Sequence, residues 1–89
     1  APHNPNGPLS TLASAQVCAS IPNFFRQEFM YNDVPWRDTI IDHPIKDMVY
    51  DGMLHLSDRP GLGVDLVEEE MEKHPGITEF ADCPDNFYI

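Results

Sequence analysis

Apolar positions recur at about one helical turn in the segment that follows the opening loop. They are Leu12, Ala13, Val17 and Ile21. Ser10 or Thr11 can cap the start of a helix. Pro22 ends it, because the residue before a proline is pushed out of the helical region. The pattern predicts a helix that begins at Ser10 or Thr11, ends before Ile21 and Pro22, and buries this apolar face.

The next seven residues, NFFRQEF at positions 23–29, favour a strand. Alternate side chains of a strand point to opposite faces. One face would carry Phe24, Arg26 and Glu28, and the other Phe25, Gln27 and Phe29. Phenylalanine on both faces predicts burial on both sides, as in a parallel sheet covered by helices. A loop, a helix and a strand in this order make half of a β/α repeat.

The remainder has shorter signals. Residues 36–41 predict a short helix within a long excursion, and residues 53–56 predict a short extended segment between two turns. Asp65 and Glu68 have the spacing of a capping box, which predicts a helix over residues 66–73. We expect Gly61 and Gly63 to allow positive φ or close backbone packing.

Composition and charge narrow the function. The 89 residues allow at most one small domain, and nine prolines predict many turns. The net charge of −10 argues against nucleic acid and anionic membrane surfaces as partners. No apolar run has the length of a membrane span. Cys18 and Cys83 are expected to be free thiols, which favours a cytoplasmic location.

Three side chains are candidates for chemistry. His3 lies in a stiff loop of Pro, Asn and Gly, where a histidine is either simply solvated or held for catalysis. Glu28 lies near the carboxyl end of the predicted strand, where an unpaired buried carboxylate would be costly. It is either hydrated outside the sheet or functional. Arg26, on the same face, is expected to form an ion pair with Glu28 or another acid.

The remaining histidines and the cysteines do not have metal-ligand spacing. They are His43, His55, His74, Cys18 and Cys83. We therefore expect no metal site made by this segment alone.

These pieces, taken in order, resemble a known family. The stretches PHNPNGP, IPNFFRQEF and DGMLHLSDRPGLGVDLVEE are similar to the C-terminal part of enolase-superfamily enzymes. Within that superfamily they most resemble the mandelate racemase subgroup and its sugar-acid dehydratases, such as galactonate and gluconate dehydratase. The resemblance covers roughly residues 1–70.

The resemblance implies an α/β fold, as the C-terminal fragment of a modified (β/α) TIM-type barrel. Residues 1–42 would supply the last β/α units: the end of strand 7 near His3, a helix, and strand 8 at residues 23–29. Residues 43–76 would return to an N-terminal capping domain, and residues 77–89 form an acidic tail without assignment. The chain would then be part of a longer protein, expected to form a homo-oligomer.

The implied chemistry is Mg²⁺-dependent dehydration of an aldonate or aldarate, by α-proton abstraction and β-elimination to a 2-keto-3-deoxy acid. His3 matches a catalytic acid/base oriented by an upstream Asp, and Glu28 matches a group that hydrogen-bonds the substrate carboxylate. The Mg²⁺ ligands would lie outside this segment, which alone should be inactive. Arg26 departs from the apolar residue expected there.

Two other functions stay open. A racemase, epimerase or cycloisomerase of the same superfamily shares the proton abstraction but loses no water. A non-enzymatic acidic interaction module is a different class. It would need its own core, yet the apolar residues are divided among one helix, one strand and scattered turns.

Overall fold

A computed structural model describes residues 1–30 and 34–76. Its elements, in chain order, are α1 (Pro8–Ser20), the 3₁₀ helices η1 (Arg37–Ile40) and η2 (Ile45–Asp47), strands β1 (Val49–Tyr50) and β2 (Met53–Leu54), and α2 (Glu68–Glu72). None of the helices in these two ranges is long and apolar enough to cross a membrane.

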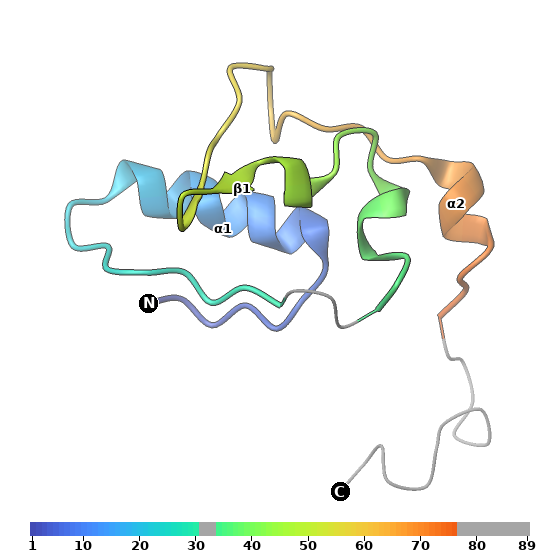
Figure 1. Cartoon of the computed structure of the whole chain (residues 1–89), viewed down its shortest axis with the longest axis horizontal. Coiled ribbons are helices and arrows are strands. Elements are labelled where there is room, and N and C mark those ends of the chain that lie inside the picture. Colours follow the sequence, from blue (N-terminus) through green and yellow to red (C-terminus); the bar gives the residue numbers. More distant parts are fainter. Residues whose placement is uncertain (31–33, 77–89) are drawn as a thin grey trace, which may run out of the picture.

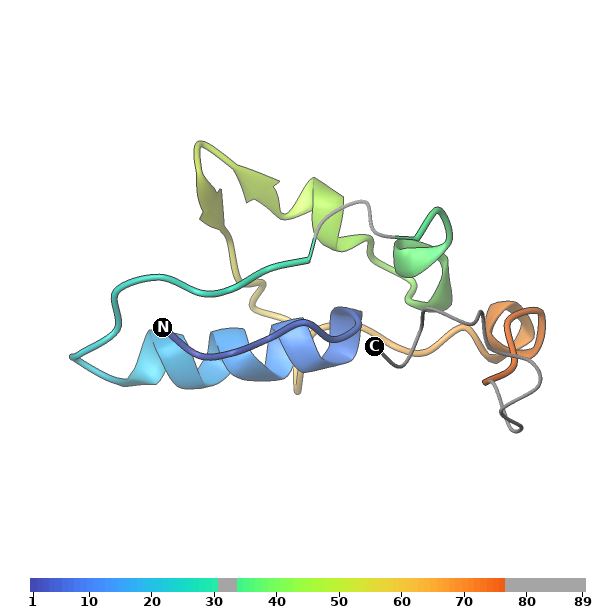
Figure 2. The same cartoon turned by 90° about the horizontal axis from the view of Figure 1, so that it is seen from below.

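Residues 1–7, α1 and residues 24–30 form a path of extended segment, helix and extended segment. The two extended segments run in the same direction, and α1, which connects them along the chain, runs in the opposite direction, in both views (Figures 1 and 2). Contacts between Asn4 and Glu28 hold the two segments side by side. The predicted helix is therefore found between two extended segments, neither of which is a β-strand among the described residues.

The strand predicted at residues 23–29 is not formed. The segment is extended, but it makes no backbone ladder within the part of the chain that the structure describes. Burial on both faces is also wrong here, since Phe25 is 73% exposed and Phe24 is exposed as well. A strand needs a neighbour that pairs with its backbone, and Asn4 reaches this segment only at Glu28.

The helix α1 forms where the sequence predicts one, with two corrections. It begins at Pro8 with Gly7 as its N-cap, not at Ser10 or Thr11, because a proline is already shaped for the first helical position. It ends at Ser20, before Ile21 and Pro22, as expected.

The buried face of α1 also differs from the prediction. Its buried residues are Pro8, Thr11, Leu12, Ala15 and Cys18. Of the predicted stripe, only Leu12 is buried, while Ala13, Val17 and Ile21 are exposed. Cys18 is a free thiol, as predicted, whereas Cys83 lies outside the described residues.

Residues 34–76, the second half of the described chain, are built around a small hairpin and one antiparallel bridge. The predicted short helix at residues 36–41 is found as η1. The predicted extended segment becomes β2, paired antiparallel with β1 across the Asp51-Gly52 turn. Both turn residues have positive φ, 55° and 72°, which suits a tight hairpin turn.

Gly63 also adopts positive φ, at 81°, as expected. A Cβ atom at this position would come within 2.4 Å of the Ser57 hydroxyl oxygen. Glycine therefore allows this turn to close both through its φ and through the close approach of Ser57.

The capping box predicted at Asp65 and Glu68 is wrong. Ile41 and Leu66 form an antiparallel bridge, and the Val67 N–H donates to the Ile40 carbonyl at 2.8 Å. This pairing keeps residues 65–67 extended, so α2 begins only at Glu68 and has no side-chain cap. A tertiary contact has overridden a local helix signal.

The core lies where α1 meets this second half. Among the described residues, its buried cluster consists of Leu12, Ile41 and Ile45. Partly buried side chains, including Phe29 and Val49, pack around the cluster. The core is therefore small, and it fixes α1 against η1 and η2.

Asp42 connects the two paired segments and predicts a pH effect. The Asp65 N–H donates to its carboxylate at 2.8 Å, and His43 Nδ1 lies 2.9 Å away. These two contacts hold the pKa of Asp42 below its ordinary value of 3.8. The stabilisation is therefore present above pH 3.8 and is lost as the pH falls through the folded-state pKa.

In the intact protein, we expect Asp42→Ala to lower the melting temperature at about pH 6, and the difference from wild type to shrink toward about pH 3. Thermal unfolding across this range measures it. Asp58→Ala, at an exposed turn, is the control. A difference that stays constant with pH would contradict this role.

Candidate active site

His3 and Glu28 meet at the N-terminal end of the fold. His3 Nδ1 lies 2.9 Å from Glu28 Oε2. The His3 side chain is 82% exposed and that of Glu28 is 43% exposed, so the pair faces open space. If Nδ1, which faces Glu28, carries the ring proton, Nε2 is left as an acceptor on an exposed side chain. The structure thus brings together the two residues that the sequence predicts for the site.

A buried asparagine holds this pair in place. Asn4 is 0% exposed, and its main-chain N–H donates to the same Glu28 Oε2 that faces His3. Its side-chain Nδ2 donates to the Glu28 carbonyl at 3.2 Å and to Thr11 Oγ1 at 2.8 Å. Ser10 Oγ donates to Asn4 Oδ1 at 3.0 Å. Asn4 therefore joins the His3 loop, the first turns of α1 and the Glu28 segment.

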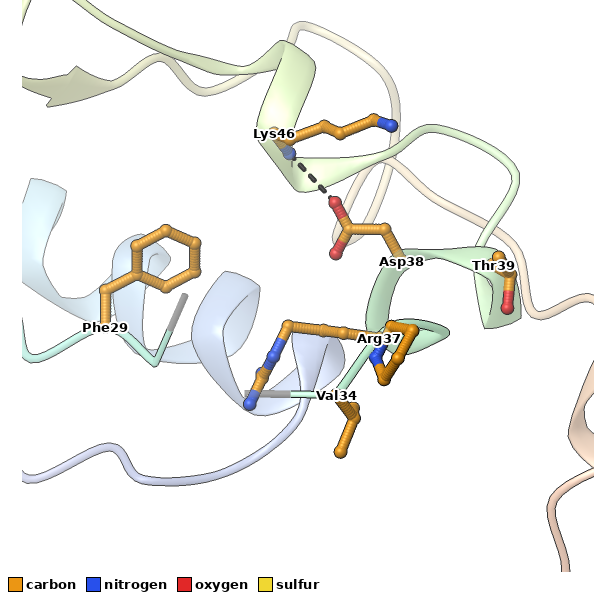
Figure 3. Close-up of a pocket in the computed structure, with 7 residues that line it drawn as sticks. Phe29, Val34, Arg37, Asp38, Thr39 and Lys46 are labelled. Atoms are coloured by element: carbon orange, nitrogen blue, oxygen red, sulfur yellow. Dashed lines mark hydrogen bonds between the residues drawn. The ribbon is translucent and has the colours of Figure 1, made fainter. Parts of the chain in front are cut away.

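Arg37 holds the other end of the His3 loop. Its guanidinium group is mostly buried and donates to the Asn6 carbonyl at 2.8 Å. Figure 3 shows Arg37 beside Asp38, whose carboxylate turns away toward Lys46 and accepts its backbone N–H at 2.9 Å. η1 thus anchors the loop that carries His3.

The neighbours of Glu28 show how its segment is oriented. Gln27 Nε2 donates to the Thr11 carbonyl at 2.9 Å, so Gln27 faces α1 while Glu28 faces His3. The ion pair expected between Arg26 and Glu28 is not found. The Arg26 guanidinium instead lies 4.4 Å from the centre of the Phe25 ring, because the Glu28 carboxylate is already engaged by His3 and Asn4.

Metal ligands do not converge here. Within residues 1–30 and 34–76, no three His, Cys, Asp or Glu side chains come together as a possible metal site. The His3–Glu28 pair supplies only two such groups. These residues therefore do not fit a metal centre of their own.

The sequence did not indicate a role in the site for Asn4 or Arg37, and it indicated Thr11 only as a possible helix cap. Asn4 stands in the stiff loop already noted around His3, directly before the helix whose first turns supply Ser10 and Thr11. An amide placed there can meet hydroxyl groups of the helix start. The bond from Arg37 to the Asn6 carbonyl spans a large sequence separation, and no local pattern in the sequence indicates it.

The chain has clear relatives among known proteins. It is 34% identical over 72 residues to a D-xylonate dehydratase of Haloferax volcanii, covering 81% of this chain and 17% of that protein. It is 41% identical over 68 residues to a D-mannonate dehydratase of Caulobacter vibrioides, covering 76% and 16%. It is 39% identical over 69 residues to a D-galactonate dehydratase family member of Oceanicola granulosus, covering 78% and 16%.

The chain thus spans about a sixth of the length of these relatives. No solved structure matches it. Residues 1–70 match the family described as enolase C-terminal domain-like, which confirms the resemblance found in the sequence and implies a TIM-barrel-type region. The chain belongs to the enolase C-terminal domain-like family.

Proposed function

We propose that this chain is part of a hydro-lyase that dehydrates a sugar acid, either an aldonate or an aldarate. The reaction removes the proton next to the carboxylate and the hydroxyl group one carbon further on, and it yields a 2-keto-3-deoxy acid and water. The contact between His3 and Glu28 carries the proposal, because it sets an acid/base group beside a carboxyl group at an exposed site. Relatives named as dehydratases of xylonate, mannonate and galactonate support it.

In this proposal His3 moves a proton at Nε2. Its Nδ1 faces Glu28 Oε2, and a carboxylate partner on one ring nitrogen fixes the orientation and tautomer of the other. The resemblance assigns the orienting role to an upstream Asp, whereas in this chain Glu28 occupies the Nδ1 side. Nε2 then takes the proton from the substrate or returns it to the departing hydroxyl group.

Glu28 would use its two oxygens differently. Oε2 faces His3 and accepts the Asn4 N–H. Oε1 is therefore the oxygen left to share a hydrogen bond with the carboxylate of the substrate. This arrangement is compatible with the substrate-binding role that the resemblance gives to Glu28.

The cofactor of the proposed enzyme is Mg²⁺, held by residues outside this segment. The described residues do not bring together three side chains that could ligate a metal ion. The resemblance to the superfamily is what supports Mg²⁺.

We further propose the domain organisation that the resemblance implies. Residues 1–42 would belong to the barrel, residues 43–76 to the segment that returns to a capping domain, and residues 77–89 to an acidic tail. The path of extended segment, α1 and extended segment supports the first assignment. The protein would act on a small molecule in the cytoplasm as a homo-oligomer, without nucleic acid or membrane partners.

A screen of the intact protein tests the function. We expect at least one aldonic or aldaric acid, incubated with Mg²⁺ in D₂O, to lose water and form a 2-keto-3-deoxy acid. Glu28→Gln should slow this reaction, while Ser20→Ala, at the exposed far end of α1, should not. Exchange or inversion at the α-carbon without loss of water would instead favour a racemase or epimerase. If none of the sugar acids loses water or exchanges its α-proton, both the dehydratase and the racemase or epimerase are rejected.

A further inference from the structure

We propose that Asn4 is a positioning residue that sets the geometry of the Glu28 carboxyl group, an inference that rests on the proposed function. Asn4 is completely buried next to two candidate catalytic side chains that are themselves exposed. Its hydrogen bonds reach both the backbone and the carboxyl group of Glu28.

The side chain of Asn4 is fully engaged. Its two N–H donors are used by Thr11 Oγ1 and the Glu28 carbonyl, and its oxygen accepts from Ser10. An amide has only these two donors and one carbonyl oxygen, so each side-chain polar group has a partner. Buried polar groups that are fully satisfied hold a single arrangement.

This network determines where the Glu28 carboxyl group lies. The side-chain bond fixes the main chain of residue 28 against α1, and the main-chain N–H of Asn4 fixes Oε2. No hydrogen bond to Oε1 is formed among the described residues, and the Glu28 side chain is 43% exposed. A small displacement of a group that binds substrate lowers the rate strongly, by about 10²-fold for about 1 Å.

Replacing the side chain should therefore act through Glu28. Asn4→Ala keeps the main-chain N–H but removes the bonds to Thr11, Ser10 and the Glu28 carbonyl. We expect kcat to fall by about 10- to 100-fold, because the main chain of Glu28 is no longer held by Asn4 and its carboxyl group can then move. In a Glu28→Gln background the same change should cost less than about 3-fold, since residues that act as a unit are not additive.

Ser20→Ala serves as the control for a change in α1 that leaves this network intact. Losses of equal size in both backgrounds would show that Asn4 acts only by stabilising the fold, and would overturn the proposal. A kcat for Asn4→Ala within about 3-fold of wild type would overturn it too.

A second measurement does not depend on activity. In the intact protein labelled with ¹⁵N-asparagine, the main-chain amide signal of Asn4 is identified by its loss in Asn4→Asp. We expect Glu28→Gln to shift this signal, because Oε2 accepts that N–H. If the signal shifts but the protein dehydrates no sugar acid, the contact between Asn4 and Glu28 is supported and the proposed function is rejected. A signal that does not move would overturn the positioning role whatever the activity.

Discussion

Replacement of His3 by Asn in the intact protein is expected to lower kcat for dehydration by about 10²- to 10⁴-fold. Asparagine retains some hydrogen bonding to Glu28 but cannot take up or release a proton. Hydroxide is a poor leaving group, so the loss should lie toward the upper end of this range. Because the His3 side chain is 82% exposed, the melting temperature should hardly change. Initial rates at saturating substrate and thermal unfolding measure the two effects.

His43 provides a matched control for this experiment. It is also exposed and also pairs with a carboxylate through Nδ1, since Asp42 Oδ1 lies 2.9 Å away. It lies between η1 and η2 and takes no part in the contacts of Glu28. His43→Asn should therefore leave kcat within about 3-fold of wild type. A loss of less than about tenfold for His3→Asn would remove His3 from the catalytic residues.

Local signals in the sequence predicted those elements that local chemistry decides. Pro22 ends α1, and Asp51-Gly52 forms the hairpin turn, because φ preferences act within one or two residues. The Asp65–Glu68 signal failed because pairing of Ile41 with Leu66 keeps residues 65–67 extended. A short window of sequence does not indicate a contact between segments that are distant along the chain.

The prediction of the buried face of α1 was wrong for a related reason. The helix is rich in Ala and Ser, so several faces are nearly equal in hydrophobicity and the position of its neighbours decides which one is buried. Here Thr11 and Ala15 are buried and Val17 is left exposed, and Thr11 bonds with Asn4 and Gln27. The alternation at residues 23–29 did separate Glu28 from Gln27 correctly, since Gln27 contacts α1 and Glu28 contacts His3.

His3 and Glu28 became candidates through their residue types and positions in the chain, and their proposed roles come from the resemblance to the superfamily. Asn4 was not a candidate. Asn4 acts through bonds to residues that are adjacent only in the folded chain, Glu28 and Thr11. Asparagine is mostly exposed in folded proteins, and in a polar loop it is usually solvated. Only the burial of Asn4 distinguishes its role from that of a solvated loop residue.

The isolated 89-residue chain is expected not to fold cooperatively. Its core within the described residues is a cluster of three buried side chains, Leu12, Ile41 and Ile45. Large apolar side chains are left exposed in the same ranges, among them Phe25 at 73% and Met53 at 59%. Two short paired strands make a sheet that is marginal by itself in water.

Burial of such side chains stabilises a fold by about 1.5–3 kcal/mol each, so this chain forgoes much of the energy that offsets the entropy of ordering its backbone. Calorimetry of the purified chain should show no cooperative transition, and Leu12→Ala should change its heating curve little. In the intact protein, where we expect further polypeptide to cover Phe25 and Met53, Leu12→Ala should destabilise by about 2–5 kcal/mol. A sharp transition from a monomer of the 89 residues, lowered by Leu12→Ala, would show instead that this small core is sufficient.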